Sequence, residues 1–285
     1  MNKLKIALQK KGRLSEQSVE LIQECGISLT NGARRLISVS GNFPLEIMYL
    51  RDDDIPRYVA DGVADIGIVG ENVVEEEQVQ VTTREKLGFA KCRMSLAVPK
   101  TESYSDIRFF NGRKVATSYP NILRSFFENQ NVQAEIHEIS GSVEVAPGIG
   151  LSDGIFDIVS SGSTLISNGL KEVETVIRSE AVLIANEQME SDKNRILEQL
   201  LFRIRSVKKS NNNKYILLNA PNDKLDVITR LIPGMKSPTV MPLADEGWSS
   251  VHSVLNENDF WEVIDQLKEN GAQGILVIPI ENMTV

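Results

Sequence analysis

The sequence predicts an α/β protein with two similar lobes that face a cleft, followed by a smaller α+β domain. Three observations carry this prediction. Strand-like and helix-like segments alternate over the first two thirds of the chain, a pattern typical of βαβ units and largely parallel sheets. One short string of residues recurs in both lobes. A polar segment then precedes a different order of elements near the C-terminus.

The composition excludes several classes of protein. The chain has 285 residues, 41% of them hydrophobic and 25% charged, which suits a globular protein of two or three domains. Lys and Arg number 31 against 39 Asp and Glu, and the net charge of −8 argues against a nucleic-acid partner. Two cysteines and two histidines provide neither a disulfide framework nor a histidine-rich metal site. Without a signal peptide or an apolar stretch of spanning length, we expect a cytoplasmic protein with no membrane partner.

The first lobe is predicted to begin with a strand, a polar turn and a helix. Residues 3–9 alternate between apolar and polar side chains, and the turn KKGR follows them. Ser15 is expected to cap the helix, which ends at Gly26. The other elements of this lobe are expected as strands at 36–39, 45–50 and 65–69 and a helix at 54–61.

An internal repeat connects the two lobes. The string DG-x-x-DI occurs at residues 61–66 and again at 153–158, each time before an apolar run that leads to glycine. We interpret it as a structural repeat in which Asp-Gly ends a helix and the second aspartate starts a strand; the alternative is a chance recurrence. Two such lobes form a cleft at the carboxyl ends of their strands, where α/β proteins bind ligands. The other elements of the second lobe are expected as strands at 95–98, 114–116 and 157–160 and a helix at 122–129.

The chain is then predicted to return to the first lobe and to enter a separate domain. Residues 179–185 form a strand of the first lobe, and residues 191–208 form a helix with an apolar stripe. The segment SVKKSNNN at 206–213 is the clearest linker, and the order βαββαβ beyond it indicates a small ferredoxin-like domain. Its elements are expected at 215–220, 223–231, 239–243, 250–255, 259–270 and 274–280. The predicted domains are lobe I (1–94 and 179–209), lobe II (95–178) and a C-terminal domain (210–285).

One loop of lobe II carries the chemistry. The sequence SSGST at residues 160–164 follows a predicted strand and precedes a short helix, so its N–H groups and hydroxyls suit a phosphate. Asp153 and Asp157 are expected near this loop, where carboxylates accept hydrogen bonds from vicinal sugar hydroxyls. A phosphate cradle beside such acids matches a phosphoribosyl donor. The competing interpretation is an ordinary helix cap with acids on the surface.

The same stretch resembles a family signature. The spacing E-x5-G-x-S-x2-I-x-D-I-x2-S-G-x-T-L resembles that of the ATP phosphoribosyltransferases, the enzymes that commit metabolites to histidine synthesis. Segments such as LQKKGRLSEQS, LRDDDIPRYVADGVADIGIVGENV and VATSYPNIL also look like the family, so the resemblance covers essentially the whole chain. Ser161 stands where many members have threonine, and both residues supply a hydroxyl. The C-terminal third resembles the long form, which carries its own regulatory domain.

The resemblance implies a fold, a reaction and a set of partners. The fold would be a two-lobed catalytic core, similar to periplasmic binding proteins, with a C-terminal ferredoxin-like (ACT-like) regulatory domain. The enzyme would transfer the phosphoribosyl group of phosphoribosyl pyrophosphate to N1 of ATP, with inversion, without a covalent nucleophile and with release of pyrophosphate. Mg²⁺ would accompany the donor phosphates without a dedicated protein cage. L-histidine would inhibit the enzyme, which would form homo-oligomers (dimers and hexamers).

The resemblance also implies three groups of site residues. The donor would bind to Glu144, Asp153, Asp157, Ser161, Gly162, Ser163 and Thr164. ATP and pyrophosphate would bind to Lys10, Arg13, Arg51, Glu71 and Arg93, with Arg93 lining the cleft from lobe I. Inhibitory histidine would bind to Asp223, Thr239, Ser253 and the backbone near Ala272. The competing interpretations are a solvated basic turn for the first cations and a helix cap for Asp223.

A second class of function fits the two-lobed plan. Solute-binding receptors and the effector domains of transcription regulators also bind ligands between two α/β lobes. We favour these two classes less than the enzyme. We find no signal peptide and no helix-turn-helix segment before the first strand, and such proteins rarely need a phosphate-binding loop. For the run Asp52-Asp53-Asp54 we prefer a role at the start of a helix over a role in a site.

Overall fold

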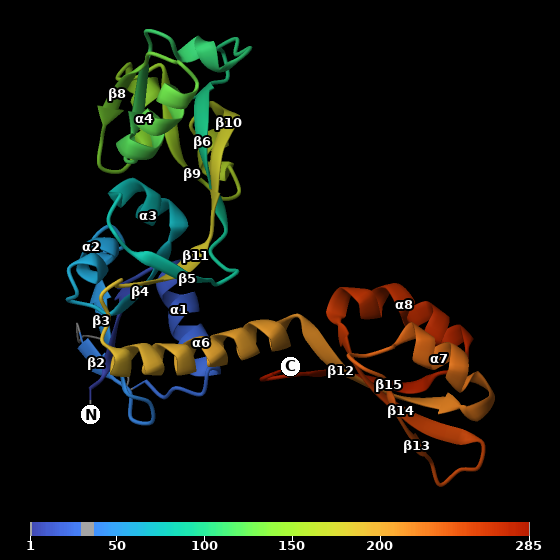
Figure 1. Cartoon of the computed structure of the whole chain (residues 1–285). Helices are drawn as coiled ribbons and strands as arrows, with labels where there is room; N and C mark the ends of the chain where they lie inside the picture. Colours follow the sequence, from blue (N-terminus) through green and yellow to red (C-terminus); the bar gives the residue numbers. More distant parts are fainter. Residues whose placement is uncertain (1, 30–36, 285) are drawn as a thin grey trace. The chain divides into compact units, whose positions relative to one another are not determined.

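The computed structural model describes residues 2–29 and 37–284, and these form three β-sheets (Figure 1). The chain divides into one compact unit of Met1–Gln23 and Ile27–Leu197 and a second of Glu24–Gly26 and Glu198–Val285. The division falls inside α6 (Ser191–Asn211) and not at its end, where the sequence predicted it. Within the described ranges, no helix has the length and apolar character needed to cross a membrane.

Lobe I is built on a six-stranded sheet of order β2-β3-β1-β4-β11-β5. Its elements are β1 (Leu4–Gln9), α1 (Arg13–Glu24), β2 (Ile37–Val39), β3 (Leu45–Leu50), α2 (Ile55–Ala60), β4 (Ile66–Gly70), α3 (Glu71–Glu77), β5 (Thr82–Lys86) and β11 (Ala181–Ala185). The strands β3, β1 and β4 are parallel, whereas β11 is antiparallel to both β4 and β5. The predicted return of the chain to lobe I is therefore confirmed. Residue 36 of the predicted second strand lies outside the described residues.

The start of α1 differs from the prediction. Ser15 was expected to cap the helix, but α1 begins at Arg13, directly after Gly12, whose φ is +100°. Ser15 therefore lies in the first turn, with its side chain buried. A left-handed residue is a position that glycine adopts without strain, so the KKG turn leads straight into the helix.

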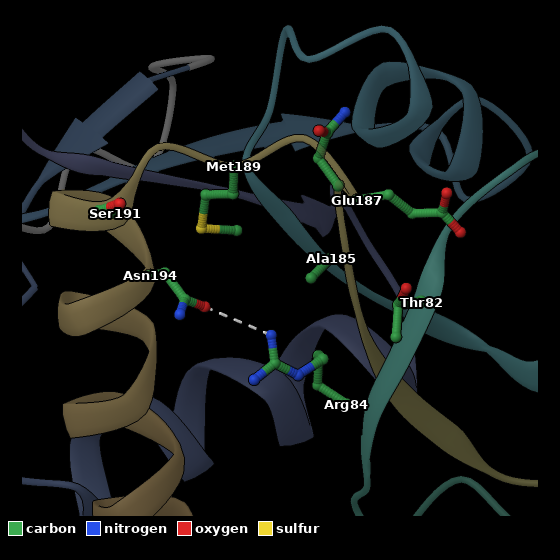
Figure 2. Close-up of a pocket in the computed structure, with 8 residues that line it drawn as sticks. Thr82, Arg84, Ala185, Glu187, Met189, Ser191 and Asn194 are labelled. Carbon is green, nitrogen blue, oxygen red and sulfur yellow. Dashed lines mark hydrogen bonds between the residues drawn. The ribbon is translucent and has the colours of Figure 1, made fainter.

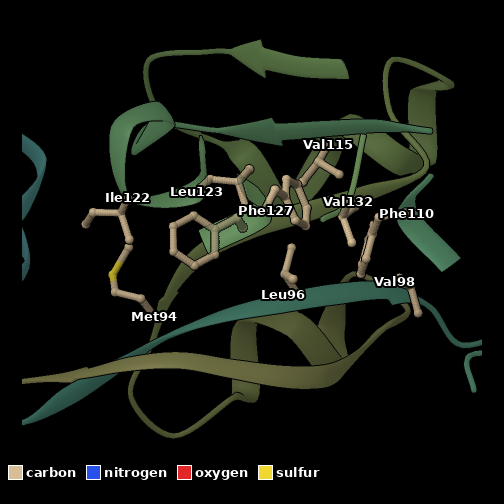
Figure 3. Packing of buried hydrophobic residues seen from close by; sticks show 10 residues of the cluster. Met94, Leu96, Val98, Phe110, Val115, Ile122, Leu123, Phe127 and Val132 are labelled. Atoms are coloured by element: carbon tan, nitrogen blue, oxygen red, sulfur yellow. The ribbon is translucent and has the colours of Figure 1, made fainter. Parts of the chain in front are cut away.

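Lobe II is built on a five-stranded sheet of order β10-β6-β9-β7-β8. Its elements are β6 (Cys92–Pro99), η1 (Ile107–Phe110), β7 (Lys114–Thr117), α4 (Pro120–Asn129), β8 (Glu135–Glu138), η2 (Val143–Ile149), β9 (Gly154–Val159), α5 (Ser163–Ser167) and β10 (Leu170–Ser179). The strands β8, β7 and β9 are parallel, and β6 and β10 are antiparallel additions. Leu96 on β6, Phe110 on η1 and Phe127 on α4 pack in one buried cluster (Figure 3).

The string DG-x-x-DI does not mark equivalent positions in the two lobes, so the predicted repeat is wrong: Asp61-Gly62 follows α2, whereas Gly154 begins β9. In lobe I, the N–H of Asp65 donates to the Lys5 carbonyl (2.9 Å), and its carboxylate accepts from the Lys5 N–H (2.8 Å). In lobe II, Asp153 makes the same two bonds to Lys114, both at 2.8 Å. Each pair ties the start of a strand to the start of its parallel neighbour. Asp153 is therefore the counterpart of Asp65, and Asp157 lies inside β9 and does not start it.

The C-terminal domain has the predicted ferredoxin-like fold. Its antiparallel sheet has the order β13-β14-β12-β15. Its elements are β12 (Asn213–Pro221), η3 (Asn222–Lys224), α7 (Leu225–Leu231), β13 (Thr239–Pro242), β14 (Trp248–Asn256), α8 (Glu257–Glu269) and β15 (Gln273–Pro279). Ile216 and Leu218 of β12 pack with Ile228 of α7 and Phe260 of α8 to form its core.

The predicted linker SVKKSNNN is not a loop. Residues 206–211 form the last turns of α6. Val207 and Ser210 are each only 1% exposed, and the Ser210 hydroxyl donates to the Val207 carbonyl at 2.8 Å. The Ser206 hydroxyl likewise donates to the Phe202 carbonyl at 2.9 Å. Burial of Val207 and Ser210 keeps this segment helical where the polar composition alone predicts a linker.

Candidate active site

The carboxyl ends of three parallel strands bring predicted site residues to one edge of lobe I. Lys10 follows β1, Arg51 follows β3 and Glu71 follows β4, and these strands are neighbours in the sheet. Arg13 lies at the start of α1, on the same edge. Lys10, Arg13 and Arg51 are all exposed, so this edge presents three cations to ligands. The site predicted for lobe I is therefore assembled at the expected end of the sheet.

Two of these side chains are held by ion pairs. The Arg51 guanidinium donates to the Asp53 carboxylate at 2.8 and 3.2 Å. Glu71 pairs with Lys86 of β5 at 2.8 Å, which raises the pKa of the Lys86 ammonium. Asp54 occupies the cap position of α2, but its side chain makes no capping hydrogen bond. Within the acidic run, Asp53 therefore orients Arg51, a role that the helix interpretation did not include.

The predicted phosphate loop lies directly after β9 in lobe II. Gly162 has a φ of +80°, and the hydroxyls of Ser161 and Ser163 are 3.0 Å apart. The side chains of Ser161, Ser163 and Thr164 are exposed. The first N–H groups of α5 have no carbonyl partner within the helix. The loop therefore offers hydroxyls and main-chain N–H groups on one exposed turn, as a phosphate requires.

Arg93 holds the root of this loop. Its guanidinium makes two hydrogen bonds of 2.6 Å to the Glu172 carboxylate of β10 and one of 3.0 Å to the Ser160 carbonyl. These bonds hold the pKa of Glu172 below its usual range. The prediction that Arg93 belongs to lobe I is wrong, because β6 joins the lobe II sheet from Cys92 onward. Arg93 supports the loop from within its own lobe.

Asp157 is a half-buried acid within β9. Its carboxylate accepts the Ile158 N–H at 2.7 Å. Burial raises its pKa to about 6, against the lowering effect of that hydrogen bond, and the charge of Glu144 raises it further. Burial, followed by the charge of Asp157, also raises the pKa of Tyr119. The two lobes meet two residues beyond Tyr119, where Glu76 of α3 accepts the Asn121 N–H at 3.0 Å.

Tyr119 was missed by the sequence reasoning. It lies at the carboxyl end of β7, directly before α4, and so at the same sheet edge as the loop after β9. Its segment VATSYPNIL was used only as a family resemblance. Its position points to a functional role, because it follows a parallel strand and precedes a proline that starts a helix.

Asp153 does not lie near the loop. It precedes β9, whereas the loop follows that strand, and a strand of this length separates the two by roughly 20 Å. Its carboxylate is engaged by the Lys114 N–H at 2.8 Å. The expectation that both acids lie beside the loop is therefore wrong for Asp153. The predicted strand began at Asp157, but β9 begins at Gly154, so extended backbone separates Asp153 from the loop.

The four predicted histidine-binding residues do not share one face of the C-terminal domain. Thr239 pairs with His252, so both side chains lie on one face of the sheet, and Ser253 points to the other. Ser253 is only 5% exposed, and its hydroxyl donates to a main-chain carbonyl of the same domain at 2.8 Å. Asp223 is exposed after β12, and Ala272 is buried before the neighbouring strand β15, so these two share one edge.

A separate cavity of about 310 Å³ opens at the opposite edge of lobe I (Figure 2). Ala185 at the end of β11, Met189 and the first turn of α6 line it. Arg84 reaches across it to the Asn194 side chain, at 3.4 Å. No side chain predicted for the active site lines this cavity, so it is distinct from the candidate active site.

The candidate active site offers oxygen ligands but no preformed metal cage. Within residues 2–29 and 37–284, no three His, Cys, Asp or Glu side chains are arranged to hold a metal ion. The charge of Glu144 raises the pKa of Asp157. Carboxylate oxygens fit a Mg²⁺ ion that keeps waters and is shared with substrate phosphates.

Comparison with known proteins identifies the family. A family model described as ATP phosphoribosyltransferase matches residues 51–206, and one described as HisG, C-terminal domain, matches residues 210–282. An ATP phosphoribosyltransferase of Cytophaga hutchinsonii is 59% identical over 280 residues, 98% of each chain.

Solved structures agree with this match. The ATP phosphoribosyl transferase (HisG:HisZ) complex from Thermotoga maritima is similar to 71% of this chain and 98% of its own, with a TM-score of 0.61 and 28% identity. The protein Tv2483 bound to L-arginine shares the fold, with a TM-score of 0.50, 12% identity and coverage of 74% of this chain and 86% of its own. The periplasmic-binding-protein-like plan of the two lobes is thereby confirmed. By its sequence and its fold, the chain belongs to the ATP phosphoribosyltransferase family.

Proposed function

We propose that lobe II binds the phosphoribosyl donor and that lobe I binds ATP, in the reaction of this family. The chain is an enzyme of the first step of histidine biosynthesis. It transfers the phosphoribosyl group of phosphoribosyl pyrophosphate to N1 of ATP and releases pyrophosphate. The non-catalytic alternative of a solute-binding protein is not favoured, because relatives over the full length of the chain are named as transferases.

The position of the donor site is inferred mainly from the exposed turn after β9. Ser161, Gly162, Ser163 and Thr164 would bind the 5′-phosphate through hydroxyls and main-chain N–H groups. The bonds from Arg93 to Glu172 and to the Ser160 carbonyl fix the root of that turn before the donor arrives.

Asp157 is the acid assigned to the ribose. It lies within β9, three residues before Ser160, with a pKa raised to about 6 by burial, so it is ionised at neutral pH and would accept hydrogen bonds from the ribose hydroxyls. Glu144, whose charge raises the pKa of Asp157, is assigned to the same site. Asp153 is not part of this proposal, because it lies at the other end of β9.

The cations at the edge of lobe I are assigned to ATP. Lys10, Arg13 and Arg51 are exposed at the ends of adjacent strands and suit a triphosphate. Glu71 lies on the same edge, paired with Lys86. Attack by N1 of adenine at C1 of the ribose requires alignment of two anionic substrates, which opposing lobes provide.

Magnesium is assigned to the donor phosphates, with Asp157 and Glu144 as the acids that would supply protein oxygens. When bound, Mg²⁺ neutralises charge that develops on the departing pyrophosphate. The residues of this chain position the donor: the loop would hold its 5′-phosphate, and Asp157 would hold its ribose.

Regulation and assembly complete the proposal. L-histidine would bind to the C-terminal domain at Asp223 and Ala272, and at Thr239 and Ser253. Because Ser253 is buried and its hydroxyl is bonded within its own domain, it does not reach a ligand together with Thr239, which is exposed on the other face of the sheet. Thr239 is open to a second copy of the domain, so we propose a homo-oligomer, with dimers assembling into a hexamer.

The reaction itself is the test of the proposed function. The full chain is incubated with ATP, phosphoribosyl pyrophosphate and magnesium, and formation of the nucleotide adduct is followed by absorbance. We expect product only when both substrates are present, and loss of turnover in excess chelator with unchanged circular dichroism. A chain that binds both substrates but forms no adduct would contradict the proposal, and full turnover in chelator would contradict the role of magnesium.

A further inference from the structure

We propose that the hinge between the two lobes contains a subsite for a diphosphate group, formed by Arg178 and Lys91. The inference rests on the proposed function, because it assigns that subsite to phosphates of the same reaction. The main observation behind it is a cavity of about 230 Å³, which both cations line.

The cavity lies where the chain crosses between the lobes. One crossing runs from β5 to β6 and the other from β10 to β11 (Figure 1). Lys91 belongs to the first crossing, whereas Arg178 and Glu180 belong to the second. Glu71, at the carboxyl end of β4, also lines the cavity and links it to the predicted ATP edge of lobe I.

The cationic side chains that line this cavity outnumber its carboxylates. Lys86 is paired with Glu71 at 2.8 Å, and the Glu180 carboxylate accepts the Gly88 N–H at 2.9 Å. Among the residues that the structure describes, no carboxylate lies within 4.0 Å of the charged groups of Lys91 or Arg178. Two cations therefore face the cavity without acidic partners.

Arg178 lies directly opposite Arg93 in the antiparallel pair of β10 and β6, so both side chains project from the same face of the sheet. The two oxygens of Glu172 bind Arg93 at 2.6 Å and neutralise its charge. Among the residues that the structure describes, Arg178 therefore stands beside an arginine that is already paired and has no carboxylate partner of its own.

The size and the surroundings of the cavity select the ligand. A volume of about 230 Å³ is smaller than the ~300–1,000 Å³ of pockets that enclose drug-sized ligands, so it suits phosphate groups better than a whole nucleotide. Arg93, opposite Arg178, touches the Ser160 carbonyl at the root of the donor loop. The diphosphate group is therefore either the pyrophosphoryl group of the donor or part of the ATP triphosphate.

The experiment measures pyrophosphate binding to the full chain by calorimetry, with magnesium present, for the parent and for Arg178→Gln and Lys91→Gln. We expect each variant to lose about tenfold to a hundredfold in affinity, as for a lost hydrogen bond to a charged group. Arg178→Lys should recover part of the affinity because it restores the charge. Arg108→Gln, an exposed arginine of η1 in the same lobe, is the matched control and should bind like the parent.

Steady-state kinetics separates the two sources of the diphosphate. A raised KM for the donor with an unchanged KM for ATP assigns the subsite to the donor, and the reverse result assigns it to ATP. Parent-like pyrophosphate affinity in both Arg178→Gln and Lys91→Gln would overturn the subsite. A parent chain that binds pyrophosphate but forms no adduct would instead count against the proposed reaction, so the two failures are distinguishable.

Discussion

Asp157 is expected to be unfavourable for stability and favourable for binding. Its pKa is raised from 3.8 to about 6, so the folded state binds its proton more tightly than the unfolded state does. Asp157 therefore stabilises the folded state most below about pH 4, and this contribution to stability is lost as the pH rises through about 6.

Asp157→Asn should therefore be more stable than the parent at about pH 7, by up to about 3 kcal/mol, and the difference should disappear near pH 4. Urea unfolding of both proteins at several pH values measures this. The same variant should bind the donor more weakly. A stability difference that does not change with pH would contradict the raised pKa.

Thr164→Val tests the donor loop at one hydroxyl. Valine keeps the size of the side chain and removes the group that is expected to bond a phosphate oxygen. We expect donor binding to weaken by about 1–3 kcal/mol. Calorimetric titration with the donor is the measurement, and Ser167→Ala in the same helix, whose hydroxyl donates to the Ser163 carbonyl (2.9 Å), is the control. Unchanged donor affinity in Thr164→Val would remove the hydroxyl from the site.

Site residues were predictable where their surroundings are local in sequence. The loop of Ser161 to Thr164 follows one strand and precedes one helix, and its position was predicted correctly. Arg93 and Asp153 were misplaced because their positions depend on strand pairing across the lobe II sheet.

At the scale of elements, α3 and α4 are joined across the two lobes by one buried carboxylate. Glu76 is only 8% exposed, and its oxygens accept the N–H groups of Asn121 and Ile122, each at 3.0 Å. The Asn121 side chain donates in return to the Glu76 carbonyl at 2.9 Å. Glu76 therefore caps a helix of the opposite lobe and fixes the start of α4, next to Tyr119.

Glu76→Ala should destabilise the protein by about 2 kcal/mol, because two N–H groups at the start of α4 lose their acceptor. Denaturant unfolding gives the loss, and hydrogen exchange should speed up in the first turn of α4. Glu75→Ala, the exposed neighbour on α3, is the matched control and should change neither. Parent-like exchange at Asn121 and Ile122 in Glu76→Ala would show that this contact does not hold the helix.

The bounds of an element were predictable where the apolar periodicity and the flanking turn residues agree. They were not predictable where these two signals conflict. The strand at 45–50 was predicted with the bounds that the structure has, because its apolar run is enclosed by turn residues. The linker at 206–213 was wrong because serine and asparagine suggest a loop, whereas tertiary burial of Val207 keeps the helix. Composition describes what a segment prefers alone, and burial decides what it adopts in the fold.

At the scale of the whole molecule, the match between family and fold places the catalytic core and the C-terminal domain in separate compact units. Inhibition by histidine would then require that the ligand favour one arrangement of the catalytic lobes over another. The two units are connected through α6, which contributes residues to both.

We expect millimolar histidine to slow turnover and Asp223→Ala to weaken histidine binding by about tenfold, as for a lost bond to a charged amino group. Calorimetry gives the affinity, and adduct formation gives the inhibition. Asp226→Ala, on the neighbouring helix α7, is the control for loss of an acid. Undiminished affinity in Asp223→Ala would remove Asp223 from the site, and turnover indifferent to histidine would remove the regulation.

The position of β11 has a consequence for the order in which a ribosome lets this protein fold. β11 lies between β4 and β5 in the lobe I sheet, yet it is translated after all of lobe II. Until it leaves the exit tunnel, β5 has no partner among the strands that the structure describes, and one side of β4 stays open. The strands of lobe II, in contrast, are all present once Ser179 has emerged. The nascent chain therefore begins lobe I first and completes it last.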